Sequence, residues 1–374
     1  MILHEVRVVF EPIGRDPVAA LCERIDLAND MLELADPFGV ELPFTRELWD
    51  ACPTDTQISI HIDDSRVLTG FIDERTKTGS KSRGSTIRLE GRDKGGRLVD
   101  ESAPLTTFAG LGIEDLAREI VRPWFDVVSL SNARNRALIK GRGRRSAAIS
   151  REPAIQSGTD VRRKVDPGET RAQVLLYFLE LAGLLAWSTA DGREFVVGEP
   201  NYSQAPQWRF QVGDEATNVE EHDYRESVAE RYSSITVCGT SRGNGQNYAG
   251  NVLKRATIHD LGGDFQRAKQ LIVADHDVNS VEKAQDRALR EKELRDAQGR
   301  ALSLTVPGFG QVLGGVDGEP PAIYAFDTVT RWEDVEADIR GDFLITRVHF
   351  QTDKNGGQWT QLDLVPVGTE LRAR

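Results

Sequence analysis

The segment "GFIDERTKTGSKSRGSTIRLEGRDKGGRLVD", residues 70–100, is rich in Gly, Lys and Arg. Such a composition occurs in phosphate-binding loops and nucleic-acid contacts, and also in turns between strands. Neither GxxxxGK[ST] nor GxGxxG is present in it, and a P-loop would need a helix directly after its glycines. The polar part at 76–85 lies instead between 66–75 and 86–91, which both show strand patterning. We therefore predict a long β-hairpin with a solvated tip and no phosphate site.

Strand patterns also precede this hairpin. Residues 57–63 alternate strictly, with Ile58, Ile60 and Ile62 on one face and polar side chains on the other. This alternation is typical of a half-buried strand. Residues 4–12 predict another strand, so the start of the chain is expected to be β-structure.

A similar pattern returns near the C-terminus. Residues 341–367, "GDFLITRVHFQTDKNGGQWTQLDLVPV", contain a strand pattern, a polar tip with glycines and a returning strand pattern. Residues 70–91 have the same arrangement, although the two segments share little sequence identity. The similarity suggests an internal duplication. We therefore expect two related β-barrel domains, one at each end of the chain.

The middle of the chain has mixed α and β patterning. Residues 112–124 place apolar side chains on one helical stripe, and 167–187 predict an apolar helix with a capped start. Residues 184–198 predict two strands joined by an Asp-Gly turn. We expect a small α+β domain here.

The fold class predicted from these patterns is β-rich α+β. The expected domains are a first barrel at 1–100, the α+β domain at 101–200, and a second barrel at 201–374. The second barrel domain includes the clearest helix of the chain, 279–298, whose narrow apolar face predicts shallow packing.

Residues 132–164 are strongly basic, with only Glu152 and Asp160 opposing the Lys and Arg side chains. No aromatic residue is present to stack on bases, which disfavours a site for single-stranded nucleic acid. We predict an arm that contacts an acidic protein surface, and a nucleic-acid or lipid patch is the alternative. The candidate partner-contact residues are Arg142, Arg144, Arg145, Arg162 and Arg163.

Composition limits the classes of function. The chain has 374 residues, 39% of them hydrophobic, which suits two or three globular domains. Its longest apolar block, 174–187, is interrupted by Glu180 and suits a buried helix better than a membrane span. The first residues lack the pattern of a signal peptide, and three widely spaced cysteines support no disulfide framework. A formal net charge of -12 disfavours general binding to nucleic acid.

No catalytic, cofactor-binding or metal site is predicted. "IHDLGGD" (258–264) and "ADHD" (274–277) place His beside Asp, but a metal site needs further ligands at defined positions. "HDYRES" (222–227) lacks the GxSxG elbow that would support a Ser-His-Asp triad. The remaining histidines form neither HExxH nor HxxxH.

The order of several motifs resembles one known family. These motifs are "GFID" (70–73), "GRDK" (91–94), "LVD" (98–100) and "IEDLAREI" (113–120), followed by the segments 169–198, 229–241 and 281–309. Together they are similar to the baseplate hub proteins of Mu-like tailed phages, in the group of late control gene D tail proteins. The resemblance spans most of the chain, and the basic segment 132–164 is its main departure.

The resemblance implies a virion structural protein without catalytic activity or cofactor, assembled in the host cytoplasm. It implies two tail-tube-like barrels in each subunit and a homotrimer that presents six barrels to a hexameric tail tube. The implied partners are the tube or distal tail protein above, the trimeric spike below, and neighbouring baseplate proteins. Genomic DNA would pass during ejection through an acidic lumen without specific binding. The alternatives are a tail-associated peptidoglycan hydrolase and a nucleic-acid-binding module that uses 132–164.

Overall fold

The structure is a computed structural model of the 374-residue chain. It describes residues 3–81, 84–131, 162–213, 217–229, 231–239, 254–259, 268–275, 278, 280–311, 322–352, 357–369 and 371. The chain divides into two compact units. The first comprises Met1–His222, Ser303–Val367 and Arg372–Arg374, and the second comprises Asp223–Leu302 and Gly368–Leu371.

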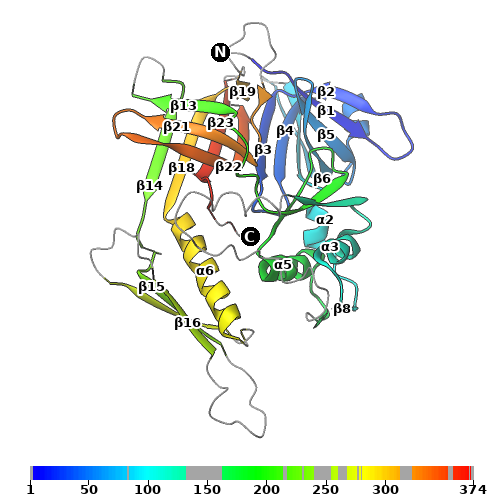
Figure 1. The fold of residues 1–374 in the computed structure, drawn as a ribbon. Coiled ribbons are helices and arrows are strands. Elements are labelled where there is room, and N and C mark those ends of the chain that lie inside the picture. The colour runs from blue at the N-terminus through cyan, green and yellow to red at the C-terminus, as the bar shows by residue number, and fades with distance from the viewer. Residues whose placement is uncertain are drawn as a thin grey trace. The chain divides into compact units, whose positions relative to one another are not determined.

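Thirteen strands form one continuous sheet (Figure 1), and it has two halves that are separate in sequence. The N-terminal half contains β1 (Val6–Glu11), β2 (Val18–Leu21), β3 (Arg24–Asp30), β4 (Pro37–Pro43), β5 (Gln57–Ile62), β6 (Ser65–Ser80) and β7 (Gly84–Asp93). The C-terminal half contains β13 (Trp208–Val212), β14 (Glu221–Glu226), β18 (Arg300–Pro307), β21 (Thr328–Asp334), β22 (Ile339–Thr352) and β23 (Gln358–Pro366).

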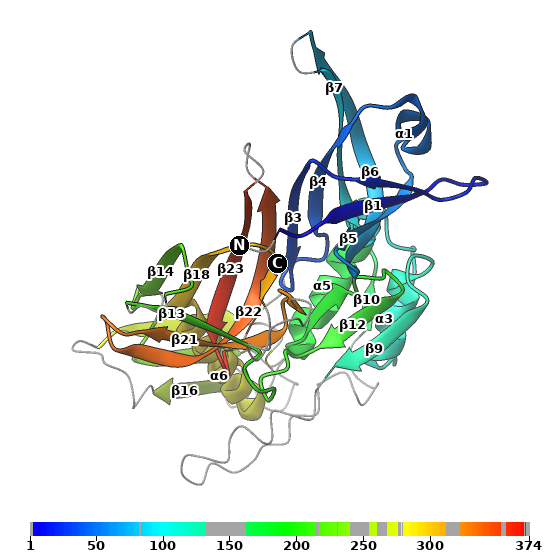
Figure 2. The same cartoon turned by 90° about the horizontal axis from the view of Figure 1, so that it is seen from above.

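The two halves repeat the same strand order. Neighbouring strands run β3-β4-β7-β6-β5-β1 in the first half and β14-β18-β23-β22-β21-β13 in the second. In each half the sequence order is the same, so β6–β7 corresponds to β22–β23. Figure 2 shows these two hairpins extending toward the same side. One difference lies at the outer strand, since β1 pairs antiparallel with β5 whereas β13 pairs parallel with β21.

The two hairpins also share one irregularity. On β6 the register shifts between Ile72 and Glu74, three positions after the first pair, and on β22 it shifts between Ile345 and Arg347, again three positions after the first pair. A β-bulge bends the strand and increases its local twist. The same bend at the same position in both hairpins is the strongest structural sign of the duplication that the sequence suggested.

Glycines of the first hairpin permit close backbone approach at this bend. A Cβ atom on Gly70 would lie 2.1 Å from the Arg92 carbonyl oxygen, and one on Gly91 would lie 2.1 Å from the Phe71 carbonyl oxygen. Real side chains do not fit at these distances. The glycines of "GFID" and "GRDK" are therefore required by strand packing.

Strand β22 joins the two halves. One of its edges pairs with β21 as far as Ile345 and then with β3 from Arg347 to Gln351. Phe350 of β22 lies opposite Leu27 of β3, and both side chains are fully buried. The junction is therefore built on backbone pairing and on a shared apolar core.

The predicted pair of closed barrels is not found among the described residues. The strands form one open sheet that ends at β2 and β14, with β13 and β21 branching from β22. The physical reason is that β22 divides one edge between β21 and β3, so neither half closes on itself. The β-rich character that the sequence predicted is confirmed.

The first hairpin is longer than its sequence predicts. Residues 76–80 lack apolar side chains but continue as strand, with Thr76 opposite Arg88 and Ser80 opposite Gly84. Helix α1 (Arg46–Ala51) and Phe44 support this extension. The Arg75 guanidinium lies 4.1 Å from the Trp49 ring centroid and the Lys77 ammonium 3.8 Å from that of Phe44.

Helices and short strands of the first unit form a second core. They are α2 (Gly96–Asp100), β8 (Thr107–Ala109), α3 (Ile113–Val121), β9 (Val127–Ser131), β10 (Arg162–Lys164), α5 (Arg171–Ala182), β11 (Leu185–Ser188) and β12 (Glu194–Gly198). The apolar stripe predicted on α3 is buried in this core. Thr170 and Gln173 form a capping box at the start of α5, and Gly183 ends it in a left-handed conformation.

The second unit contains a three-stranded sheet with one long helix. The strands β15 (Ser234–Gly239), β16 (Lys254–His259) and β17 (Gln270–Asp275) form the sheet, and α6 (Val281–Gln298) packs against β15 and β16. Its core is small, and Ala284 and Ala288 are the buried residues that α6 contributes. A two-stranded ladder, β19 (Gly310–Gln311) with β20 (Ala322–Ile323), lies in the first unit.

We expect Gly91→Ala to lower the free energy of unfolding by about 1–3 kcal/mol, because the added methyl group would overlap the Phe71 carbonyl and the Phe38 ring. The matched control is Gly39→Ala on the neighbouring strand β4, where a Cβ meets its nearest atom at 3.7 Å. That change should stay within about 0.5 kcal/mol. Urea denaturation of both variants measures the difference, and equal midpoints would contradict the close-packing assignment.

Candidate assembly interface

Signature residues of the first hairpin form an ion network. Arg92 donates from Nε to Asp73 at 2.8 Å and from its two terminal nitrogens to Asp100 at 3.1 and 2.6 Å. The hydrogen bonds that Arg92 donates to Asp100 and Asp73 raise the pKa of Arg92, and the bond accepted from Arg92 lowers the pKa of Asp100. Asp73 is the bulge residue, and Asp100 belongs to "LVD". These motif residues therefore tie the hairpin to α2 and hold the fold together.

Two buried carboxyl groups lie beside this network. Asp93 accepts the Asp36 backbone N–H at 3.2 Å and the Ser188 hydroxyl, and Asp36 accepts the Asp30 backbone N–H at 2.8 Å. Burial raises the pKa of Asp93 to about 6. Burial, and then the charge of Asp93, raises the pKa of Asp36 well above its usual range.

The carboxyl pair is better placed for structure than for catalysis. Asp93 is 4% exposed and Asp36 is 9% exposed. A general acid or base must reach a substrate atom within hydrogen-bond distance, whereas these groups bind backbone and side-chain donors of their own chain. The bond to Ser188 of β11 ties the main sheet to the α+β core.

One face of the main sheet is polar across the junction of its halves. On β4, β7 and β23, and on part of β3 and β22, alternate side chains point away from the apolar core. Ionisable residues on this face lie in pairs, which are Arg24–Glu41, Arg88–Glu90, Arg347–Asp363 and His349–Asp26. Exposed ion pairs of this kind add little stability. Their main effect is to leave the face with few unbalanced charges.

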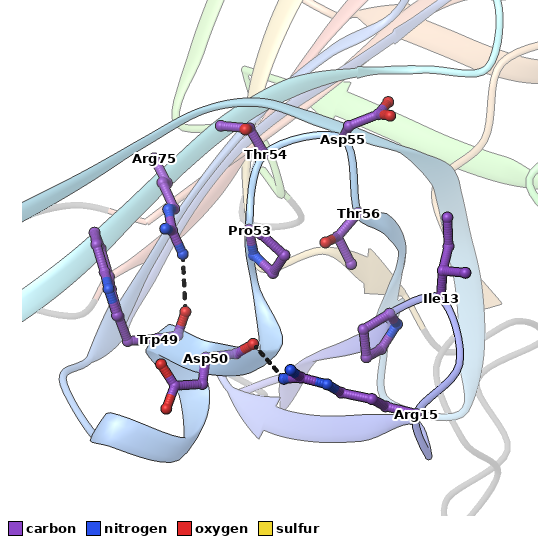
Figure 3. A pocket seen from close by; sticks show the side chains of 10 residues that line it. Ile13, Arg15, Trp49, Asp50, Pro53, Thr54, Asp55, Thr56 and Arg75 are labelled. Carbon is purple, nitrogen blue, oxygen red and sulfur yellow. Dashed lines mark hydrogen bonds between the residues drawn. The ribbon is translucent and has the colours of Figure 1, made fainter.

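A cavity of about 410 Å³ lies beside the base of the β6–β7 hairpin (Figure 3). Arg75 donates to the Trp49 carbonyl at 2.9 Å, and Arg15 donates to the Asp50 carbonyl at 3.2 Å. Ile13 lies at the rim and is 99% exposed. Arginine side chains that are fixed by hydrogen bonds, beside an exposed apolar side chain, suit contact with another protein surface. The lining residues are Pro12, Ile13, Arg15, Trp49, Asp50, Pro53, Thr54, Asp55, Thr56 and Arg75.

The structure describes two of the five arginines predicted to contact a partner. Arg162 and Arg163 lie on β10, opposite Ala109 and Phe108 of β8. The Arg163 guanidinium lies 4.0 Å from the Tyr177 ring centroid and pairs with Glu169, so it also serves its own fold. Arg142, Arg144 and Arg145 lie outside the described residues. The partner contact of all five stays a prediction.

Histidines of the described part of the chain lie in separate places. His4 pairs with Asp63, His349 with Asp26, and His222 lies 3.9 Å from Asp334. His276 and residues 260–264 lie outside the described residues. Among the residues that the structure does describe, no group of three or more His, Cys, Asp and Glu side chains is arranged to hold a metal ion. In that same part, no helix is both long and apolar enough to cross a membrane.

The edges of the sheet are a feature that the sequence patterns did not reveal. Strand β14 carries most of the "HDYRES" residues, and its charged side chains show no apolar alternation that would predict a strand. Its pairing with β18 places it at one end of the sheet. The one sequence signal that could have suggested β14 is the length of the interval between residues 208 and 230, which has room for two short strands.

We expect the free energy of unfolding to fall as pH rises from 4 to 7, partly because of Asp93. Its pKa in the fold, about 6, lies above the ordinary 3.8. The protonated form is therefore favoured by folding, and this stabilisation is complete below pH 3.8 and is lost as pH rises through 6. Asp93→Asn should reduce the fall by on the order of 2–3 kcal/mol. Denaturation at several pH values measures it, and Asp64→Asn on the exposed β5–β6 turn is the control. A slope unchanged by Asp93→Asn would contradict the assignment.

Comparison with known proteins gives sequence and fold relatives. No family model matches the chain. The chain is 24% identical over 283 residues to the baseplate hub protein gp44 of Escherichia phage Mu, covering 72% of this chain and 66% of that protein, just under two thirds of its length.

Two solved structures share the fold over nearly the full chain. The tail protein from Neisseria meningitidis MC58 superposes with a TM-score of 0.75 at 22% identity, covering 99% of this chain and 98% of that one. The 43 kDa tail protein of prophage MuSo2 from Shewanella oneidensis superposes with a TM-score of 0.72 at 19% identity, covering 96% and 98%. The resemblance to Mu-like baseplate hub proteins that the motifs indicated is thus confirmed by the sequence comparison, and the fold is shared with these two tail proteins.

Proposed function

We propose that this protein is a structural component of a phage tail baseplate, acting as its hub within the virion. The observation that carries the proposal is the duplicated half-sheet, with the same bulge in both hairpins, in a chain related to the Mu hub protein. The residues of its signature motifs are used in packing and ion pairing, as a structural role requires. We propose no catalytic activity and no cofactor.

The duplication gives the hub a role as a symmetry adaptor. Three copies would present six related half-sheets, which approximates the sixfold symmetry of a tail tube while keeping the threefold symmetry of a spike. Rings of this kind close through head-to-tail contacts. The proposal rests on two matched half-sheets in place of the two closed barrels expected from the sequence. The proposed partners are a tail-tube or distal tail protein, a central spike and neighbouring baseplate proteins.

The polar face of the sheet is the proposed wall of a DNA channel. It offers paired charges, on a chain whose net charge is -12. A wall with free cations would bind phosphates and slow the passage of DNA, whereas paired and acidic groups would not. DNA would therefore pass without specific contacts.

The division into domains is also proposed on the basis of the duplication. Residues 1–100 and 201–374 would be the two related β-domains, and 101–200 the α+β domain between them. The second β-domain would carry β15–β17 and α6 as an insertion between β14 and β18, because the first half has only a short connection between β3 and β4.

We expect the purified chain to sediment as a trimer, with three times the 41.5 kDa mass of one chain. Sedimentation equilibrium over a wide concentration range measures this mass. Addition of the spike protein from the same tail should shift the distribution further toward the trimer. A particle that remains monomeric at every concentration, with and without the spike, would contradict the adaptor role.

We expect no saturable binding to a labelled DNA duplex at physiological salt, because the chain is acidic and the proposed channel wall has paired charges. Titrations over a salt series measure this, since phosphate contacts weaken steeply with salt. A variant with Arg142, Arg144 and Arg145 changed to Ala is the control. Tight binding that this variant loses would favour the nucleic-acid-binding alternative and contradict the channel proposal.

A further inference from the structure

Among the described strands, one pairing joins the two halves of the sheet. Each half also has a second strand edge that corresponds to one partner of this pairing and is not paired in the same way. Within the chain, β3 of the first half pairs with the far part of β22 in the second half. By strand order, β14 corresponds to β3 and β6 corresponds to β22. A contact between β14 and the far part of β6 would therefore repeat the junction.

Both of these edges are open in the described part of the chain. Pairing with β5 ends at Phe71, and Ile72 still bonds to Asp55 and Thr56, beyond which β6 has no paired strand among the described residues on this edge. The Arg75 side chain contacts α1. The matching edge of Glu74–Thr78 thus has no described strand beside it. Strand β14 pairs with β18 alone and forms one end of the sheet. Open strand edges are templates for pairing with another chain.

The shared bulge fixes which residues correspond. Counting from it, Glu74–Thr78 of β6 match Arg347–Gln351 of β22, the residues that pair with β3. For β14, the alignment comes from two hydrogen bonds. Ser227 donates its N–H to the Gly299 carbonyl at 2.7 Å, and the Ser303 hydroxyl of β18 donates to Asp363 of β23. Counting along the strands from the Ser227–Gly299 contact places Tyr224, Arg225 and Glu226 at the positions of Leu27, Ala28 and Asn29. The bond from the Glu220 N–H to the Thr305 carbonyl, at the other end of β14, is one position out of this register.

We infer that β14 of one copy of this chain adds to the Glu74–Thr78 edge of β6 in a second copy, repeating between chains the β3–β22 junction within a chain. The inference rests on the trimer proposed above and names the surfaces that would join it. Three such junctions, alternating with three internal ones, would close a ring of six half-sheets.

The side chains at the inferred contact are complementary. The register places Arg75 opposite Glu226 and Lys77 opposite Tyr224, where the internal junction has Val348 opposite Asn29 and Phe350 opposite Leu27. A carboxylate then meets a guanidinium, and an aromatic ring meets an ammonium group. Within the chain Arg75 already donates to the Trp49 and Cys52 carbonyls, and Glu226 already pairs with Arg300, so the new contacts would add to these bonds. These polar residues explain why the two edges stay soluble before assembly, whereas the internal junction is apolar and permanent.

A disulfide test follows from the register, which places Thr76 opposite Arg225. Both side chains are exposed, so Thr76→Cys with Arg225→Cys should leave the fold intact, as circular dichroism will check. Mild oxidation of this double variant should convert most of the trimer into covalent dimers and trimers on denaturing gels without reductant. The parent chain, which keeps Cys22, Cys52 and Cys238, should give none.

The matched control is Thr76→Cys with Ala19→Cys, since Ala19 is exposed on the other end strand, β2. This pair and both single Thr76 and Arg225 variants should stay uncrosslinked. A trimer by sedimentation that gives no covalent product from the Thr76–Arg225 pair would overturn the strand junction and leave the adaptor proposal standing. A chain that never forms trimers would overturn both.

Discussion

The fold depends on one strand pairing, that of β3 with the far part of β22. These strands are separated by more than three hundred residues in sequence, yet they align five residue pairs and bury Leu27 against Phe350. The Met31 N–H adds a hydrogen bond to the Thr346 carbonyl at 3.0 Å, directly at the bulge. The side chain of Gln358, on β23, also accepts a hydrogen bond from the His4 N–H and donates one to the His4 carbonyl. Without this seam the two halves would be separate sheets with exposed apolar edges.

The bulge makes that seam possible. It bends β22 after Ile345, where pairing with β21 ends, and so turns the remaining strand toward β3. The same bend in β6 leaves Glu74–Thr78 beyond the end of β5. One local irregularity therefore produces an internal junction in one hairpin and an open edge in the other. A protein that must join identical subunits needs both a fixed internal junction and an open strand edge, because closed sheets offer no edge to a neighbour.

The residues of segment 70–100, whose Gly-, Lys- and Arg-rich composition resembles that of a ligand site, instead support this strand geometry. Glycines allow the backbones to approach at the bend, and Arg92 is held between Asp73 and Asp100. Asp93 is buried and bonded to Ser188, so the sheet and the α+β core are fastened at the end of the hairpin. Charge on the polar face is largely paired within the chain. The chemistry of the described residues is thus directed to holding shape, which is the property that an assembly protein needs.

Local patterns in the sequence were sufficient for much of the fold. Alternation at Ile58, Ile60 and Ile62 predicted β5, and the capped start of α5 and the apolar stripe of α3 were recognised because their causes lie within a few residues. The order of weak motifs was also sufficient to indicate the family. Pairing partners, the bulge and the open sheet depended on contacts between distant segments, which a local pattern does not encode. For the same reason the sequence predicted two closed barrels, whereas the structure has two half-sheets joined where one edge of β22 pairs first with β21 and then with β3. The charged strand β14 is recognised only from its pairing with β18.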